Sequence, residues 1–364
     1  MRICCYITGH GFGHASRTLE VLSTIRKYEK NAFFSIRTNI PRWFIEESLP
    51  EDPNLDIFTL NTGAGLYQEN SLCFDLKRTL KEGLNFLNMQ DEIIEREIRY
   101  LKDENITSVI SDIPAWPFAA AEECGIPSYG IGNFSWDWIY EEFMGDYNEF
   151  IFIINDLQKN YEKCNKLMRL PFSPSMDIFP ERMNIPLICR RSEKTKEETL
   201  SLLGLDPSKK YVLLSFGGFS IDFSLWKEPR LPAGIEIIAS ERVPGKKGTI
   251  NSINRGILPE KGLNYKDLVA AADTVITKPG YGIVSECIAN KTKMIYTDRG
   301  PFREFPFLKK AADEYLCGIQ LSNADVSSGN ICNAVLESIE KNIHEYGLPL
   351  NGAEVAAGKI LADI

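Results

Sequence analysis

The sequence has no long hydrophobic run. A membrane-spanning helix needs about 18 or more consecutive apolar residues, and no stretch of this chain reaches that length. The apolar segment Met1–Ile7 is short and leads straight into a glycine-rich loop, unlike a secretion signal. We therefore expect a cytoplasmic protein without a membrane span, for which a peripheral membrane contact stays open.

Features of metal-binding and nucleic-acid-binding proteins are also scarce. The chain has three histidines, its nine cysteines form no Cys-x-x-Cys pair, and no Asp-x-Asp motif occurs, so we expect no metal and no other bound cofactor. Lys and Arg number 41 against 50 Asp and Glu, giving a formal net charge of −9. A protein that binds a polyanion usually presents a basic face, so we expect no nucleic-acid partner.

What the sequence does contain is a regular alternation of short β-branched runs with amphipathic segments. This alternation is typical of parallel sheets covered by helices on both faces, and 364 residues are enough for two such domains. We predict an α/β fold of two Rossmann-like units in series. The expected strands are residues 3–8, 32–37, 55–60, 106–111, 128–131, 210–215, 234–239, 274–277 and 293–296, and the expected helices are 16–28, 76–103, 119–124, 264–271, 282–289 and 353–364.

A glycine-rich loop, Gly9–Arg17, follows the first predicted strand and leads into a helix. Glycines let the backbone approach a ligand closely, and a helix N-terminus favours negative charge. A dinucleotide-binding fingerprint would need Gly-x-Gly-x-x-Gly and an acidic residue about 20 residues later. Here His14 stands at the third glycine position, and the next strand ends near Arg37 without that acid. A nicotinamide or flavin enzyme is therefore disfavoured.

His14 is a candidate general base, because an imidazole titrates near neutral pH. Asp112 ends another predicted strand, and the carboxyl ends of parallel strands meet at one edge of a sheet. Asp112 can therefore orient the imidazole of His14. The alternatives are that His14 only caps a helix and that Asp112 is the N-cap of the next helix. For His10, support of the loop and acceptor binding are equally good interpretations.

In the second half, Lys278–Glu286 follows a strand and begins a helix. Gly280 and Gly282 leave room for a diphosphate at the helix N-terminus. Glu286 lies about one turn further on, where a carboxylate can accept hydrogen bonds from ribose hydroxyls or simply stabilise the helix dipole.

Two further loops of the second half have weaker signals. The segment Ser215–Phe219 ends a strand in a Gly-Gly turn whose N–H groups can hold a phosphate. Arg303 and Glu304 lie in a loop of alternating charges, aromatics and prolines. They can bind sugar hydroxyls or phosphate, or be ordinary surface charges.

With these motifs in place, the chain resembles the inverting GT-B glycosyltransferases along nearly its whole length. Residues 9–22 resemble their acceptor-side glycine–histidine loop, and residues 109–127 resemble the aspartate strand that pairs with that histidine. The resemblance implies that His14 is the base and Asp112 its partner. The implied donor-binding residues are Gly217, Gly218, Phe219, Lys278, Gly280, Tyr281, Gly282, Ser285, Glu286, Arg303 and Glu304, and the implied acceptor-binding residues are His10, Gly11, Phe12, Gly13, Arg17, Asn133, Ser135, Trp136 and Asp137.

The segments 9–17, 133–140, 278–286 and 304–308 resemble more specifically the N-terminal, glycosyltransferase-like half of plant L-arabinokinases. The kinase activity of that family belongs to a separate C-terminal domain, and this sequence has no glycine–serine ATP loop of that type. The resemblance therefore does not imply a sugar kinase.

The domain boundaries follow from the proline- and charge-rich segment between the two halves, and the GT-B resemblance implies the position of the last helix. We expect an acceptor domain at residues 1–185, a linker at 186–209, a nucleotide-sugar domain at 210–351, and a final helix at 352–364 that packs back on the first domain with some hinge motion between the two.

We predict an inverting hexosyl- or N-acetylhexosaminyltransferase that uses a nucleoside-diphosphate sugar, UDP-linked, and a hydroxyl acceptor. Retaining GT-B enzymes resemble one another in a Glu-x7-Glu donor motif, whereas this chain has Lys278 and Glu286 at those positions. Two alternatives stay open: a nucleotide-sugar epimerase or hydrolase, and a non-catalytic nucleotide-sugar-binding protein.

Overall fold

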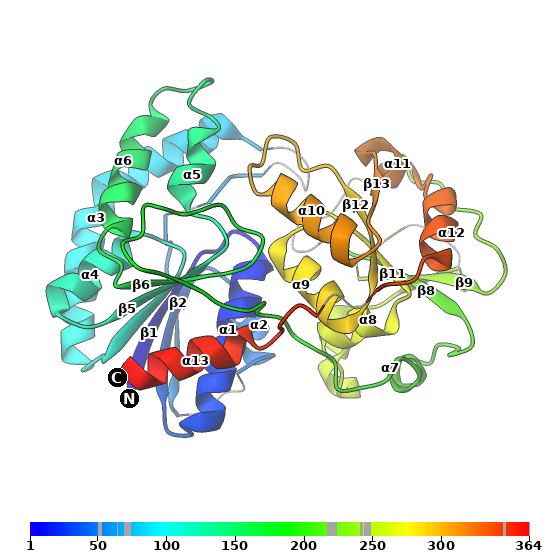
Figure 1. The fold of residues 1–364 in the computed structure, drawn as a ribbon, viewed down its shortest axis with the longest axis horizontal. Coiled ribbons are helices and arrows are strands. Elements are labelled where there is room, and N and C mark those ends of the chain that lie inside the picture. The colour runs from blue at the N-terminus through cyan, green and yellow to red at the C-terminus, as the bar shows by residue number, and fades with distance from the viewer. Residues whose placement is uncertain are drawn as a thin grey trace.

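The computed structural model describes residues 1–49, 53–63, 65–68, 74–216, 224–240, 243, 249–344 and 347–363. These residues form two halves, each built on a parallel sheet with helices packed against it (Figure 1). The predicted α/β fold with two Rossmann-like units is thereby confirmed.

The first sheet has the strand order β3-β2-β1-β4-β5-β6-β7, and all neighbouring strands are parallel. In the register between β1 and β4, Ile7 lies opposite Asp112. The loop after β1 and the end of β4 therefore lie at the same edge of the sheet. The strands are β1 (Arg2–Ile7), β2 (Phe33–Thr38), β3 (Leu55–Thr59), β4 (Ser108–Asp112), β5 (Ser128–Gly132), β6 (Lys166–Arg169) and β7 (Arg182–Asn184), with helices α1 (Phe12–Tyr28), α2 (Arg42–Glu46), α3 (Leu76–Asp103), α4 (Trp116–Cys124), α5 (Trp136–Glu141) and α6 (Phe150–Tyr161).

The second sheet repeats this plan with the order β10-β9-β8-β11-β12-β13, again parallel throughout. Its strands are β8 (Lys210–Leu214), β9 (Ile235–Ala239), β10 (Ile250–Ser252), β11 (Thr274–Thr277), β12 (Lys293–Thr297) and β13 (Ile319–Leu321). The helices are α7 (Lys196–Leu203), α8 (Tyr265–Ala271), α9 (Tyr281–Asn290), α10 (Phe305–Tyr315), α11 (Asn323–Ser328), α12 (Cys332–Glu340) and α13 (Gly352–Asp363), and 3-10 turns occur at Arg255–Ile257 and Pro259–Lys261.

The segment 186–209, predicted as a linker, contains a helix and is in that respect corrected. Helix α7 begins at a capping box, in which the Thr195 hydroxyl accepts from the Glu198 N–H and the Glu198 carboxylate accepts from the Thr195 N–H. This pairing satisfies N–H groups that a helix start leaves without partners. The Thr-x-x-Glu spacing was present in the sequence, but the charged run around it favoured the interpretation as a linker.

The final helix, α13, lies against α1 of the first half (Figure 1). Its buried face consists of Ala353, Ala356, Ala357 and Ile360, and these small side chains allow a close approach. The N–H of Gly352 donates to the Leu187 carbonyl at 3.1 Å. A Cβ at Gly352 would lie 2.2 Å from the Pro186 carbonyl oxygen, so a side chain does not fit there.

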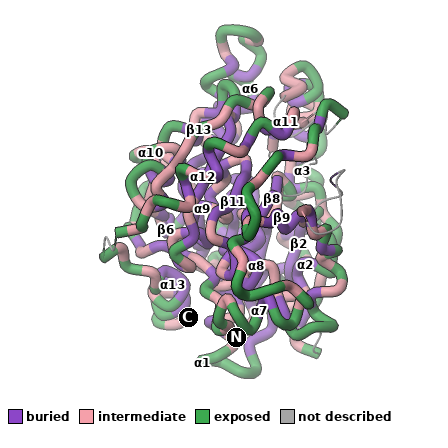
Figure 2. Tube along the Cα trace, turned by 90° about the vertical axis from the view of Figure 1, so that its right-hand side faces the viewer, coloured by how far each residue is buried: buried purple, intermediate pink, exposed green. Residues whose placement is uncertain are grey.

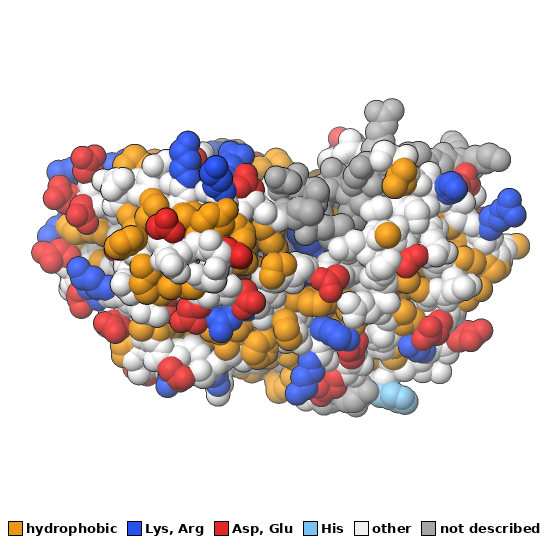
Figure 3. Space-filling view, turned by 90° about the horizontal axis from the view of Figure 1, so that it is seen from above, with side chains coloured by type: hydrophobic (Ala, Val, Ile, Leu, Met, Phe, Trp, Pro, Cys, Tyr) orange, Lys and Arg blue, Asp and Glu red, His pale blue; other side chains and the backbone are white. Residues whose placement is uncertain are grey.

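Burial follows the layers of the fold, because the central strands are buried while the edge strands and the outer faces of the helices are more exposed (Figure 2). On the face seen in Figure 3, basic side chains alternate with acidic ones rather than forming one wide basic surface. Among the described residues, none of the helices combines the length and apolar character that crossing a bilayer requires.

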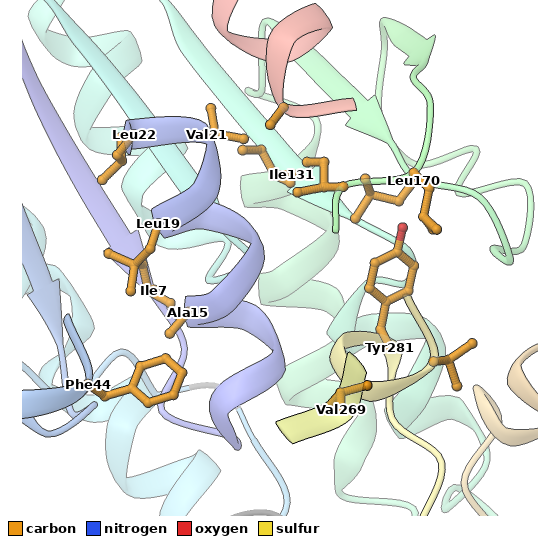
Figure 4. Packing of buried hydrophobic residues seen from close by; sticks show 14 of the residues in the cluster. Ile7, Ala15, Leu19, Val21, Leu22, Phe44, Ile131, Leu170, Val269 and Tyr281 are labelled. Carbon is orange, nitrogen blue, oxygen red and sulfur yellow. The ribbon is translucent and has the colours of Figure 1, made fainter. Parts of the chain in front are cut away.

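The two halves meet where the N-termini of α1 and α9 cross. A Cβ added at Gly282 would lie 3.1 Å from the Cα of Gly13, so the two backbones are nearly in contact. Beside this crossing, the ring of Tyr281 extends from α9 toward Ile131 and Leu170 of the first half (Figure 4). One apolar cluster thus runs across the contact between the two halves, which we call the seam.

We expect Gly282→Ala to push the halves apart and to lower the free energy of unfolding by about 1–3 kcal/mol, as overpacking typically does. Gly280→Ala is the matched control, because a Cβ there meets nothing within 4 Å. Chemical denaturation of both variants measures the difference. Equal stability of the two variants would contradict the close crossing.

Candidate active site

A cavity lies between the two halves, at the carboxyl ends of the strands of both sheets. In open α/β sheets this is where ligands bind. Its walls come from both halves and from the connecting segment. The lining residues that carry charge or aromatic rings are His10, Phe12, His14, Arg17, Phe44, Phe134, Arg190, Phe216, Arg255, Tyr265, Lys278, Tyr281, Glu286, Arg299, Phe302 and Glu304.

His14 and Asp112 are in direct contact beside this cavity. Nδ1 of His14 lies 2.7 Å from Oδ1 of Asp112, and the two residues are 7% and 0% exposed. An ionised carboxylate can only accept hydrogen bonds, so Nδ1 is the nitrogen that carries a proton in this contact, and the tautomer of neutral imidazole that fits it has its lone pair on Nε2. The ring is held edge-on against Phe134 and lies near Trp136. This is the geometry that a histidine base needs.

Asp112 also receives three hydrogen bonds from α1. Arg17 donates to both carboxylate oxygens, each at 2.6 Å, and the Thr18 hydroxyl donates at 2.8 Å. Burial alone would raise the pKa of Asp112, but the charge of Arg17, the neighbouring His14 and these hydrogen bonds lower it below its usual value. Asp112 is therefore an ionised carboxylate whose charge is balanced inside the protein.

Arg17 was predicted to bind the acceptor, and the structure gives it a different set of contacts. Its side chain is 3% exposed and turned toward Asp112, and its Nη1 donates to Asn133 Oδ1 at 2.7 Å. It still lines the cavity, but its donors are directed at protein groups.

Lys278 and His10 both line the cavity, and both have lowered pKa values. Burial, reinforced by the positive charge of Arg299, lowers the pKa of Lys278 to about 7. Burial and the neighbouring His14, Arg299 and Lys278 lower the pKa of His10 well below its usual value, so His10 is neutral at pH 7. Its Nδ1 accepts from the Leu66 N–H at 3.3 Å, which supports the loop at residues 65–68.

Glu286 lines the cavity but already has a protein partner. Arg190, from the segment between the halves, donates through Nε to Glu286 Oε1 at 2.6 Å and forms a second contact with the same oxygen through Nη2. Both side chains are at least nine-tenths buried. A ribose that binds Glu286 would therefore share this carboxylate with Arg190.

Arg303 and Glu304, predicted together as donor residues, point to different places. Glu304 lies in the cavity wall, where it accepts from Asn133 at 2.7 Å and from Arg299 at 2.8 Å. Arg303 instead bonds to the Trp138 carbonyl and to Glu141, outside the cavity lining. Adjacent residues before a helix face different sides, so the cavity includes Glu304 and not Arg303, whose role in donor binding stays a prediction.

Of the remaining predicted residues, some line the cavity and others do not. Gly11, Phe12, Gly13, Asn133, Gly280, Tyr281 and Gly282 line the cavity. Ser135, Trp136 and Asp137 are buried but do not line it, and the Ser285 hydroxyl donates to the Gly282 carbonyl. Gly217, Gly218 and Phe219 lie outside the described residues.

The cavity residues that were missed from the sequence include three arginines, Arg190, Arg255 and Arg299. Arg255 stacks over the Tyr265 ring, with its Cζ 4.2 Å from the ring centroid, and donates to the Ser215 hydroxyl at 3.3 Å. Arg190 and Arg299 lie in irregular segments and Arg255 begins a short 3-10 turn, so no periodic pattern marks the direction of these side chains. Within the ranges that the structure describes, no group of three or more His, Cys, Asp or Glu could hold a metal ion.

No protein-family model matches the sequence. Over 355 residues, 97% of its length, the chain is 31% identical to L-arabinokinase of Arabidopsis thaliana, and it spans only 33% of that protein. The similarity therefore concerns about one third of the relative.

Solved glycosyltransferase structures match the whole fold. The glycosyltransferase SnogD from Streptomyces nogalater is 12% identical, with a TM-score of 0.59 over 100% of this chain and 99% of that one. Phytolacca americana UGT2, complexed with UDP-2-fluoro-glucose and pterostilbene, is 11% identical, with a TM-score of 0.61 over 99% of this chain and 93% of that one. The chain has the GT-B glycosyltransferase fold.

Proposed function

We propose that this protein is a glycosyltransferase that moves a sugar from a nucleoside-diphosphate sugar, UDP-linked, to a hydroxyl acceptor with inversion. The observation that carries the proposal is the buried His14–Asp112 contact at a cavity whose opposite wall contains the N-terminus of α9. The structural neighbour bound to UDP-2-fluoro-glucose supports the choice of UDP.

In this proposal His14 is the general base. With Nδ1–H held by Asp112, Nε2 is the nitrogen that takes the proton from the acceptor hydroxyl. The oxygen of the acceptor then bonds to the anomeric carbon as the bond from that carbon to the diphosphate oxygen breaks, which inverts the anomeric configuration. The proton stays on His14, and the electron pair leaves with the diphosphate.

The donor side supplies positive charge for the leaving diphosphate. The N-cap of α9, Gly280, has no side chain to satisfy the first N–H groups of that helix, and such a helix start favours an anion. Lys278 and Arg255 lie in the same cavity. Lys278 stands where retaining enzymes of this fold have a glutamate, so it favours charge neutralisation over retention.

The identity of the sugar is a further part of the proposal. Because the relative with 31% identity is named for L-arabinose, we include UDP-L-arabinose beside UDP-glucose and UDP-N-acetylglucosamine as donors to be tested. Free L-arabinose belongs among the acceptors for the same reason.

Donor binding is expected to depend on the protonation of Lys278. Because its pKa is about 7 in the empty cavity, the ammonium is present below that pH and is lost as the pH rises. An esterified diphosphate does not titrate in this range, so the affinity for a UDP-sugar should fall roughly tenfold or more between pH 6 and pH 9. Calorimetry across this range measures it.

Two variants make this experiment specific. Lys278→Arg keeps a permanent charge and should bind with little dependence on pH, whereas Lys278→Met should bind weakly at every pH. A wild-type affinity that is constant from pH 6 to pH 9 would remove Lys278 from the donor site.

A further inference from the structure

A continuous chain of buried hydrogen bonds crosses from the first half to the second. Arg17 Nη1 donates to Asn133 Oδ1 at 2.7 Å, and Asn133 Nδ2 donates to Glu304 Oε1 at 2.7 Å. The second Glu304 oxygen accepts from Arg299 at 2.8 Å. Together with Asp112, these five residues are between 0% and 6% exposed. Water is therefore a poor substitute for any lost partner.

Asn133 is the junction of this chain. It is the first residue after β5, whereas Glu304 immediately precedes α10 of the other half. Its carboxamide accepts from a guanidinium through oxygen and donates to a carboxylate through nitrogen. A carboxylate at this position could accept from Arg17 but could not donate to Glu304, and an alanine could do neither.

The charges along the chain are balanced. Arg17 pairs with Asp112, and Arg299 pairs with Glu304, while the neutral Asn133 joins the two pairs. A negative charge at position 133 would compete with Asp112 for Arg17 and would repel Glu304. Since Arg17 also fixes the carboxylate that holds His14, a change at Asn133 reaches the proposed base through three hydrogen bonds, Asn133–Arg17, Arg17–Asp112 and Asp112–His14.

We infer that Asn133 is a positioning residue that couples the closed arrangement of the two halves to the orientation of His14. When the halves are together, Glu304 is hydrogen-bonded to Asn133 and Asn133 to Arg17. Arg17 in turn fixes the Asp112 carboxylate that is hydrogen-bonded to the imidazole of His14. When they separate, Arg17 loses its support from the second half. The inference rests on the proposed function only for the role of His14 as a base, because the coupling itself exists without a substrate.

The test exchanges the amide and the carboxylate across the seam. N133D places two carboxylates together, and E304Q leaves Arg299 without its carboxylate, so each single variant should disturb the seam. The double variant N133D/E304Q restores an amide facing a carboxylate, with the same total charge as the wild type. N148D, at an exposed position, is the matched control for Asn133→Asp.

Two readouts need no turnover. Hydrogen exchange of backbone amides at residues 302–307 reports closure, and it should accelerate roughly ten- to hundredfold in N133D, as expected for loss of a charge-assisted hydrogen bond. The imidazole signals in a nitrogen–proton NMR spectrum report His14, and the three histidines are assigned by replacing His10 and His344. Both readouts should change in N133D and stay unchanged in N148D. In N133D/E304Q the exchange rate should return close to wild type, because the repulsion by Glu304 is removed, and the His14 signals should move back part of the way, because the new carboxylate at position 133 still competes with Asp112 for Arg17.

Two results would overturn the inference. If exchange accelerates in N133D but the His14 signals do not move, Asn133 only holds the seam together and does not position the base. If E304Q fails to rescue N133D while both proteins remain folded by circular dichroism, the contact across the seam is not the coupling element. A failure of the proposed function would appear instead as intact coupling in a protein that binds no nucleotide sugar.

Discussion

His14→Ala is expected to lower kcat by roughly 10²- to 10⁴-fold, the usual contribution of a general base, while leaving the Kd for the UDP-sugar within about threefold of wild type. The reason is that His14 lies on the first half beside Asp112, whereas the proposed diphosphate site is formed by α9 and Lys278 of the second half. The measurement is steady-state kinetics combined with calorimetric binding of the donor.

His344→Ala is the control for this variant, because His344 is exposed and outside the cavity lining. Its kcat should equal that of the wild type. Retention of full turnover by His14→Ala would show that another group takes the proton. An equal loss of donor affinity and turnover would instead assign His14 to ligand binding.

The second large effect concerns stability. Arg17→Met keeps an apolar stem but leaves the Asp112 carboxylate, which is 0% exposed, without its guanidinium partner. Breaking a buried pair in this way typically costs about 3–5 kcal/mol of unfolding free energy. The exposed pair Arg182–Asp177 offers the control, because Arg182→Met should cost about 1 kcal/mol or less. Urea denaturation at pH 7 compares the two.

The pH dependence gives this prediction a second test. In the wild type the pKa of Asp112 is lowered, so its ion pair stabilises the protein above the unfolded-state pKa of about 3.9 and is lost as the pH falls through the lower folded-state value. Without Arg17, burial dominates and raises the pKa of Asp112. The stability difference between wild type and Arg17→Met should therefore shrink as the pH falls from 7 toward 4.

A double variant isolates the cause. Arg17→Met combined with Asp112→Asn removes the uncompensated charge, so it should recover a large part of the loss seen in Arg17→Met alone. If the double variant is less stable than Arg17→Met by the full cost of a second independent defect, lost packing of the arginine stem explains the effect and the ion pair does not.

The contact between His14 and Asp112 could be predicted from the sequence because it depends on the sheet. His14 follows β1 in the first turn of α1, and Asp112 is the last residue of β4. Because β1 and β4 are neighbours in the observed order, both residues come to one edge of the sheet. The strand and helix pattern that led to this expectation was periodic, and α3 has the predicted bounds, Leu76–Asp103. The fold and this pair were therefore within reach of sequence reasoning.

The partners of the other charged residues could not be predicted from the sequence. Arg190 reaches Glu286 across 96 positions of sequence, and Asn133 reaches Glu304 across 171. These distances depend on how the two halves are oriented, and no local pattern carries that information. Arg17 was assigned to the acceptor from the resemblance of its loop to the acceptor-side loop of GT-B enzymes, whereas the side-chain direction within the first turns of α1 brings it to Asp112.

Charge patterns in the sequence also do not show what single charged residues do. The run around Thr195 and Glu198 was interpreted as a linker, although those two residues cap α7. Arg303 and Glu304 were treated as one unit, although Glu304 enters the cavity wall and Arg303 pairs with Glu141 on the outside. Composition describes the average of a segment, whereas capping and side-chain direction are properties of single residues.

The most direct test of the central claim is a calorimetric titration of the wild-type protein with UDP-, GDP- and dTDP-sugars at pH 6.5, repeated with Glu286→Ala. The account predicts that UDP-sugars bind with a stoichiometry of one and that Glu286→Ala weakens this binding. Absence of binding by every nucleotide sugar to the folded protein would contradict a nucleotide-sugar-dependent transferase.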